Sequence, residues 1–292
     1  MHANANSEGK NQLAFKLIAL LYTVRWYNIL LTVLAQYLFA YVIITHSGGT
    51  YKDLIVDIKL HAIVLASIFS IAAGFIINNF YDFEKDLINR PKETLFNRII
   101  SKNTTLNMYF LFNILAVLVA LSASYKICIF FILFIFSLWF YSHKIQKIPF
   151  VKEFAASLLS VTSFFSIILH FNKFYAFIFI FGVFFMSLVY SRELIKQFTN
   201  YNGDIALNNT SIPVLLGFEK AKYFSVFILM LSFLSGFSIL VFYGLNLENY
   251  FIFISLICIL FNLFLLKRNQ FKTINLIYKV LIIFGIFNLL LV

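Results

Sequence analysis

Proline, glycine and cysteine are scarce in this sequence. Only 3 Pro and 10 Gly occur among 292 residues, which leaves little room for long flexible linkers. The 2 Cys residues, Cys128 and Cys258, both lie within apolar runs. Cysteines in such positions argue against a disulfide framework and against a thiolate metal site.

Charged residues are also few. They make up 12% of the chain, whereas 62% is hydrophobic and 39 residues are Phe. A soluble domain has no room to bury so much apolar surface, so the bilayer must be the solvent for most of the chain. The net charge of +11 falls in short gaps between apolar runs. This pattern indicates membrane orientation and no nucleic-acid partner.

Nine apolar runs, each long enough to cross a bilayer, follow a polar lead over residues 1–12. The lead and the length of the first run give no sign of a cleavable signal peptide. The sequence predicts an all-α, multi-pass membrane protein with one transmembrane domain over residues 13–292. Long polar loops are expected after the second span, to about residue 105, and over about 192–222. The nine predicted spans lie near 17–45, 60–81, 106–122, 127–142, 154–170, 174–191, 223–243, 249–266 and 273–291. We expect the polar residues Arg25 and Asn28 to interrupt the first of these spans.

Lys and Arg are distributed unequally between the two sides of the membrane. The loops on the side of the N-terminus hold most of the 23 Lys and Arg residues, and the opposite set holds only Lys52, Lys59, Lys126 and Lys173. Cytoplasmic loops carry the excess of positive charge. We therefore expect the N-terminus and the long polar loops to be cytoplasmic, and we expect the membrane to be the inner membrane of a bacterium. An error of one span would scramble the distribution, which favours nine.

The end of the second span carries a polar motif. Asn78, Asp82 and Asp86 follow at intervals of four residues, which places them on one face of a helix. Their oxygens are suitable ligands for a hard cation such as Mg2+. The nearby cations Arg90 and Lys92 suit an anion such as diphosphate, bridged by the metal. The alternative is a solvated helix end at the membrane surface.

A second polar helix end follows the sixth span. It extends from Arg192 to Asp204 and is expected on the same side of the membrane as the first motif. Ionisable residues near the membrane are costly and by default mark function. We expect the two helix ends to enclose one polar pocket.

These two stretches resemble the motifs of the UbiA superfamily of intramembrane prenyltransferases. The family's first motif reads Asn-Asp-x-x-Asp-x-x-x-Asp and then Asn-Arg-Pro; the stretch from Asn78 to Pro91 departs from it only at Asn79. The second stretch resembles Arg-Glu-x-x-Lys-Asp-x-x-Asp-x-x-Gly-Asp of the geranylgeranylglycerol-phosphate geranylgeranyltransferase branch. Here Gln197 and Asn200 replace two aspartates.

Two further segments carry the resemblance, which covers roughly residues 20–290. The segment from Tyr141 to Pro149 resembles a Tyr-Ser loop of the family. Arg25 and Asn28 resemble an Arg and an Asn of its first helix.

The resemblance implies nine helices around a central cavity. It also implies Mg2+-dependent transfer of a prenyl chain from an isoprenyl diphosphate to a lipid or aromatic acceptor. The implied catalytic residues are Asp82, Asp86 and Asp204. The implied metal ligands are Asn78, Asp82, Asp86, Asn200 and Asp204. The implied diphosphate contacts are Arg25, Asn28, Arg90, Lys92, Arg98, Lys147 and Lys196.

Each assignment has a plainer alternative. The basic residues could simply set the orientation, and Glu193 and Lys196 could be a helix ion pair. Three amides in place of carboxylates remove about three negative charges, so metal affinity should fall, mostly at the second motif. The enzyme would then use one well-held metal, or the protein would be a degenerate relative that binds an isoprenoid lipid or acts as an assembly factor. Survival of the other motif residues favours the enzyme, and charges at span ends disfavour a transporter.

Overall fold

The computed structural model describes residues 18–89, 101–206, 209–244 and 250–290. These residues form helices, turns and connecting segments, and no strand occurs among them. Within the described ranges, nine helices are long and apolar enough to cross a membrane. The prediction of an all-α protein with nine spans is therefore confirmed.

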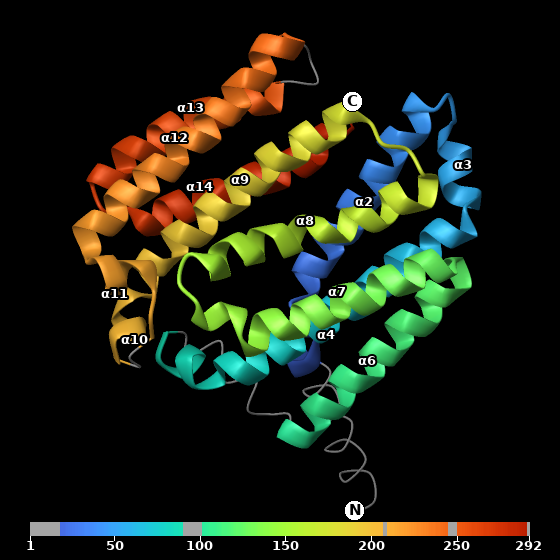
Figure 1. Cartoon of the computed structure of the whole chain (residues 1–292), viewed down its shortest axis with the longest axis horizontal. Helices are drawn as coiled ribbons and strands as arrows, with labels where there is room; N and C mark the ends of the chain where they lie inside the picture. The colour runs from blue at the N-terminus through green and yellow to red at the C-terminus, as the bar shows by residue number, and fades with distance from the viewer. Residues whose placement is uncertain (1–17, 90–100, 207–208, 245–249, 291–292) are drawn as a thin grey trace, which may run out of the picture. The chain divides into compact units, whose positions relative to one another are not determined.

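The long helices are labelled in Figure 1. They are α2 (Trp26–His46), α4 (Ile58–Asn89), α6 (Lys102–Ala123), α7 (Tyr125–His143), α8 (Val151–Phe171), α9 (Ala176–Thr199), α12 (Phe218–Tyr243), α13 (Tyr250–Lys267) and α14 (Phe271–Asn288). Four short helices connect them: α3 (Tyr51–Val56), the 3-10 helix η1 (Ile145–Lys147), α10 (Tyr201–Ala206) and α11 (Ile212–Leu216).

Two predicted loop boundaries are wrong. Helix α4 continues through the first motif to Asn89, and α9 continues to Thr199, where the sequence predicts polar loops. The rest of the expected second loop contains α10, α11 and the start of α12. An apolar run ends where the chain leaves the hydrocarbon, whereas a helix ends where its backbone is broken or capped. Neither extension contains Gly or Pro, so nothing stops the helix at the membrane surface.

The predicted interruption of the first span at Arg25 is confirmed. A helical segment over 18–23 ends in a turn, where Arg25 has a φ of 52°, and α2 starts at the next residue. A positive φ is uncommon outside glycine and needs support from neighbours. The Arg25 guanidinium lies over the ring of Phe75 of α4, 5.2 Å from its centroid, which is a cation–π contact that holds the turn. The second predicted interruption is not observed, because Asn28 lies within α2.

The chain divides into two compact units, and each combines two separate stretches. The first unit draws on Met1–Val33 and His61–Ser142, and the second on Leu34–Leu60 and His143–Val292. Each unit is described by itself. The single domain over 13–292 stays a prediction.

The first unit packs the turn before α2 against α4 and α6. Side chains from α6 cover its centre, which consists of Val24, Ile29, Ala72 and Ile76. Helices α4 and α7 also approach closely, since a Cβ on Gly74 would lie 3.1 Å from Leu138 Cδ1. Small residues permit such close approach between membrane helices.

The second unit packs α9, α12, α13 and α14 around a large apolar core. That core includes Phe184, Leu188, Ile252, Ile259 and Tyr278. A Cβ on Gly236 of α12 would lie 2.6 Å from the ring of Phe184, so only glycine lets α12 come this close to α9.

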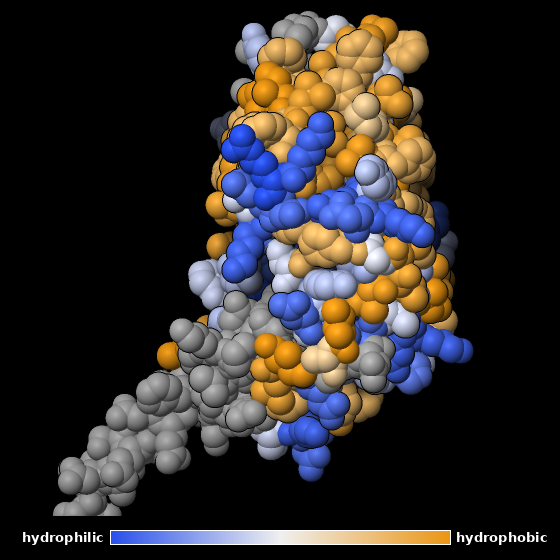
Figure 2. All heavy atoms as spheres, turned by 90° about the vertical axis from the view of Figure 1, so that its left-hand side faces the viewer, coloured by the Kyte–Doolittle hydropathy of each residue, from blue (hydrophilic) through white to orange (hydrophobic). Residues whose placement is uncertain are grey.

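The outer surface of the helices is apolar. Large hydrophobic side chains are exposed on every long helix, including Phe242, which is 83% exposed, and Tyr223, which is 74% exposed. On the face drawn in Figure 2, apolar side chains cover broad areas and hydrophilic side chains gather in separate groups. Water is a poor solvent for such a surface, and lipid is a good one. The protein is therefore an integral, multi-pass membrane protein.

Candidate functional site

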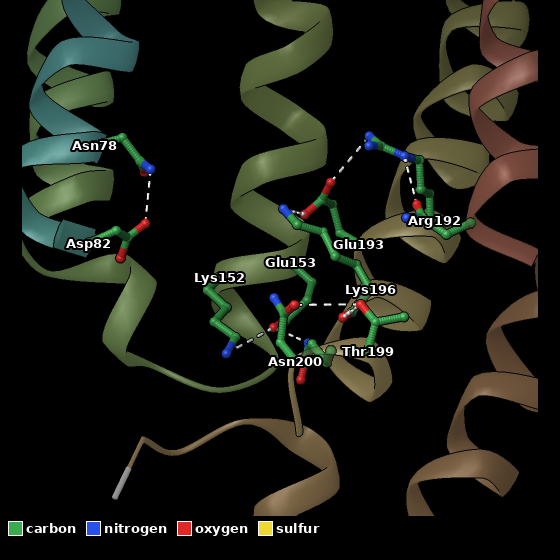
Figure 3. A network of polar contacts seen from close by, with 11 residues as sticks. Asn78, Asp82, Lys152, Glu153, Arg192, Glu193, Lys196, Thr199 and Asn200 are labelled. Atoms are coloured by element: carbon green, nitrogen blue, oxygen red, sulfur yellow. Dashed lines mark hydrogen bonds and ion pairs between the residues drawn. The ribbon is translucent and has the colours of Figure 1, made fainter. Parts of the chain in front are cut away.

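The first motif lies on the last turns of α4. Asn78, Asp82 and Asp86 are all half-buried. The side-chain amide of Asn78 donates a hydrogen bond to Asp82 Oδ2 at 2.9 Å, as Figure 3 shows. The two side chains therefore share a helix face, as predicted, and Asp86 follows one turn further along that face.

Asn79 points elsewhere. Its side chain is 9% exposed, and its Nδ2 donates to the backbone oxygen of Thr23 at 2.8 Å. This bond ties α4 to the helical segment that precedes α2. A carboxylate has no hydrogen to donate, so Asp at this position would oppose the carbonyl of Thr23 with a second oxygen. The departure at Asn79 thus has a structural reason, which the sequence did not reveal.

Arg25 lies near the first motif along α4. The ring that it covers, Phe75, precedes Asn78 by three residues and Asn79 by four, so the guanidinium lies one helical turn from the motif. Asn28 is half-buried in α2, and its backbone oxygen accepts from the Thr32 hydroxyl at 2.9 Å. The other predicted diphosphate contacts next to this motif, Arg90, Lys92 and Arg98, lie outside the described residues.

At the second motif, α9 carries a chain of charged contacts. Glu193 accepts from Lys196 Nζ at 3.1 Å and from Arg192 Nη1 at 3.4 Å. Arg192 Nε in turn donates to Asn275 Oδ1 of α14 at 3.2 Å. The ion pair that the sequence suggests between Glu193 and Lys196 is therefore confirmed. Lys196 keeps a 29% exposed side chain and stays a predicted diphosphate contact.

Gln197 is buried and connects three helices. Its Nε2 donates to Glu153 Oε1 of α8, and its Oε1 accepts from the backbone N–H of Ile212, at the start of α11, at 2.8 Å. One amide therefore acts as donor and acceptor at once. With both of its polar atoms in use, Gln197 serves the packing of α8, α9 and α11.

Asn200 and Asp204 lie one turn apart where α9 passes into α10. Asn200 caps α9, and its backbone oxygen accepts from the Asp204 N–H at 3.0 Å. Asp204 is 1% exposed. A carboxylate so well shielded from water needs compensating polar or charged groups around it.

Lys147 lies close in space to the segment after the second motif. It is exposed at the end of η1, and its backbone oxygen accepts from the Thr210 hydroxyl at 3.2 Å. The part of the Tyr141–Pro149 segment that belongs to the second unit, from His143 onward, therefore adjoins the residues that follow the second motif.

Sequence reasoning missed Glu153. This carboxylate is 3% exposed and lies in the first turn of α8, within a span of membrane-crossing length. Beside its bond from Gln197, it pairs with Lys152 at 3.5 Å. An acidic residue inside an apolar span is itself a signal of function, and that signal could have identified Glu153.

The donor set of the first motif fits Mg2+. Among the described residues, no group of three or more His, Cys, Asp or Glu side chains gathers to form a cage. Mg2+ seldom needs one, since it is usually held by one or two carboxylates together with waters and substrate phosphates. Asp82 and Asp86 with the amide of Asn78 supply that kind of set. The second motif offers the oxygens of Asn200 and Asp204.

Comparison with known families identifies the chain. The sequence model of the UbiA prenyltransferase family matches residues 29–289. The chain belongs to the UbiA prenyltransferase family. It is accordingly a UbiA-type prenyltransferase, and its reaction is prenyl transfer within the membrane.

Several similar proteins are archaeal. The digeranylgeranylglyceryl phosphate synthase of Methanobrevibacter smithii is 24% identical to this UbiA protein over 77% of the chain and 83% of the relative. That of Thermococcus gammatolerans is 28% identical over 68% of the chain and 71% of the relative.

Solved structures share the fold. A structure of digeranylgeranylglyceryl phosphate synthase has a TM-score of 0.71 at 20% identity and covers 94% of this chain and 98% of that chain. A UbiA homologue from Archaeoglobus fulgidus bound to GPP and Mg2+ has a TM-score of 0.65 at 17% identity and covers 94% of this chain and 100% of that chain. At these identities the likeness shows the fold alone.

Proposed function

We propose that this UbiA protein uses Mg2+ to transfer a prenyl chain from an isoprenyl diphosphate to a lipid acceptor. The observation that carries the proposal is the ladder of oxygen ligands on α4, in which Asn78 bonds Asp82 and Asp86 follows one turn later. The ladder stands at the end of a membrane span, where the diphosphate of a lipid-dissolved donor would be found.

The first motif holds the metal–diphosphate complex in this proposal. Asn78, Asp82 and Asp86 are the metal ligands. When bound, Mg2+ supplies positive charge against the charge that develops on the leaving diphosphate. Basic and amide side chains would bind the diphosphate, namely Arg25, Asn28, Arg90, Lys92, Arg98, Lys147 and Lys196.

In the second motif, Asn200 and Asp204 would hold what remains of a second metal site. The motif has less negative charge than the family pattern, so we expect it to hold a metal more weakly than the first motif does. Asp82, Asp86 and Asp204 are the proposed catalytic carboxylates. The Phe-rich spans form a dry chamber for the isoprenoid tail, where aromatic rings stabilise an allylic cation.

The named relatives favour one kind of acceptor. Both synthases at 24% and 28% identity are named for a glyceryl phosphate lipid. We therefore propose a lipid with a polar phosphate head as acceptor, in preference to an aromatic compound. The excess of Lys and Arg on one side supports a cytoplasmic N-terminus with both motifs on the cytoplasmic side. The inner membrane of a bacterium stays the proposed location, although these relatives are archaeal.

The test is a transfer assay with the purified full chain in detergent. Labelled geranyl, farnesyl and geranylgeranyl diphosphates are offered with Mg2+ and a panel of lipid and aromatic acceptors, and diphosphate release is measured. We expect Mg2+-dependent release that falls by about 10²–10³-fold in Asp82→Ala. The matched control is Glu219→Gln, which removes an exposed carboxylate in the first turn of α12. Absence of release with every donor from folded protein would favour a lipid-binding relative without catalysis.

A further inference from the structure

Glu153 is a buried carboxylate that the proposed function leaves unused. It is 3% exposed in the first turn of α8. Its Oε1 accepts from Gln197 and lies 3.5 Å from Lys152 Nζ. Its Oε2 is buried and has no hydrogen-bond partner among the described residues. Figure 3 shows the side chain beside Lys152 and the end of α9.

An unpartnered carboxylate oxygen is expensive to bury. A buried donor or acceptor without a partner costs about 1–3 kcal/mol, and a charged one costs more. Lys152 and the positive end of the α8 dipole compensate part of the negative charge. Such a group persists where something else contacts the remaining oxygen, and a cation is the chemical partner that a carboxylate accepts most readily.

The hydrogen bond between Glu153 and Gln197 determines which helix carries the charge. Gln197 stands where the family's second motif has an aspartate. Because its amide donates to Glu153 and accepts from Ile212, the pair contains a single carboxylate, and that carboxylate is on α8. An aspartate at 197 would bring a second carboxylate close to that of Glu153, and two adjacent carboxylates cannot readily be ionised at the same time.

Glu153 also contacts the face of α9 that carries the second motif. Gln197 and Asn200 are three residues apart, so they share one side of the helix end. Asp204 follows Asn200 by one further turn and is bonded to it through the backbone. Glu153 therefore contacts the side of α9 from which the second motif continues.

We propose that Glu153 replaces the aspartate that the second motif lacks at position 197. Its Oε2 is an additional oxygen ligand for the divalent cation that Asn200 and Asp204 hold on the diphosphate. Gln197 is a positioning residue that orients Glu153. This inference rests on the proposed function, because the cation enters with the prenyl diphosphate.

The test measures metal affinity directly. Mn2+ binding to the full chain in detergent is followed by electron paramagnetic resonance, with a non-reactive prenyl thiolodiphosphate present. Glu153→Gln keeps the acceptor for Gln197 and the volume but removes the charge. We expect the affinity of the weaker Mn2+ site to fall about tenfold or more. Glu219→Gln, which removes an exposed carboxylate, should leave the affinity unchanged.

A paired variant separates a ligand from a structural group. Glu153→Gln combined with Gln197→Asp returns the single carboxylate to α9, and it should recover most of the affinity lost in Glu153→Gln. If Glu153 has only a structural role, Glu153→Gln will lower the thermal stability without changing the Mn2+ affinity, and that result would overturn the assignment.

A second variant is available if Glu153→Gln does not fold. Glu153→Asp keeps the charge but withdraws the carboxylate by one methylene. Unchanged Mn2+ affinity in this variant would also overturn the assignment.

The same Mn2+ titration tests the role of Glu153 separately from the proposed metal-dependent prenyl transfer. Mn2+ binding by the wild-type chain that Glu153→Gln leaves unaltered would overturn only the role of Glu153. Absence of Mn2+ binding in the wild-type chain with the analogue present would overturn the proposed function, and this inference with it.

Discussion

The two polar motifs are built differently. The first stands on one continuous helix, with Asn78, Asp82 and Asp86 half-buried in successive turns. The second passes from α9 into α10, and its retained carboxylate, Asp204, is 1% exposed. Bonds to α8, α11 and α14 hold the second motif in place. Substitutions in the first motif should therefore affect chemistry, whereas those in the second should affect chemistry and folding together.

Each motif also contains an amide, Asn79 or Gln197, where the family has an aspartate, and the two amides can be compared. Asn79 donates to the Thr23 carbonyl, and Gln197 donates to the Glu153 carboxylate. A carboxylate is an acceptor only, so neither bond could form with the family's aspartate. In both places, therefore, the amide donates to an oxygen on a neighbouring segment that an ionised aspartate would repel. Nothing in the structure explains the third departure, Asn200.

Asp86→Asn in the first motif and Asp204→Asn in the second are the substitutions for which we expect the largest effects. We expect each to lower kcat/KM by about 10²–10³-fold, because each removes a proposed metal ligand. Asp86→Asn should leave the unfolding temperature unchanged, since its side chain is half-buried at a helix end. Asp204→Asn should also cost about 1–3 kcal/mol of folding free energy, because the groups that compensate a buried carboxylate lose their partner.

The two readouts are a transfer assay and thermal unfolding followed with a thiol-reactive dye. Cys128 is buried and Cys258 is half-buried, so both thiols become accessible on unfolding. Equal unfolding temperatures for the two variants would contradict the contrast between the motifs.

Asn79→Asp should have the next largest effect, on stability alone. The new carboxylate would face the Thr23 carbonyl and lose the 2.8 Å hydrogen bond, at a cost of about 1–3 kcal/mol. Asn79→Ala removes the bond without adding an opposing oxygen, so its cost should be smaller. Metal-dependent turnover of the folded protein should persist in both variants. An Asn79→Asp protein as stable as the wild type would show that the bond to Thr23 does not matter.

Local patterns in the sequence predict much of this molecule, and distant partners account for the rest. The nine spans, the break at Arg25 and the shared face of Asn78 and Asp82 follow from hydropathy and helical spacing. The roles of Asn79 and Gln197 do not. Their acceptors lie 56 and 44 residues away, and only the packed helices bring each donor to its oxygen.

Asp57, which precedes α4, links the start of α4 to the end of α8. Its Oδ1 accepts from the Leu60 N–H at 3.0 Å, the position of a helix N-cap, and its Oδ2 lies 2.7 Å from His170 Nε2 near the end of α8. Burial acts to raise the pKa of the Asp57 carboxyl, but the hydrogen bonds from His170 and Leu60 outweigh it, so the pKa is lower than the ordinary value. The carboxylate form is therefore favoured in the folded protein.

Asp57→Asn should have the smallest effect and a distinct dependence on pH. Asn is as good an N-cap as Asp, so the bond to Leu60 survives while the charge is lost, and the cost at neutral pH should be below about 1 kcal/mol. Because folding lowers the pKa of Asp57, its charge stabilises the folded state above the unfolded value of about 4. That stabilisation is lost as the pH falls through the folded pKa. The unfolding temperatures of wild type and Asp57→Asn should therefore converge below about pH 4. A constant difference from neutral pH to pH 3 would mean that the carboxylate contributes nothing to this junction.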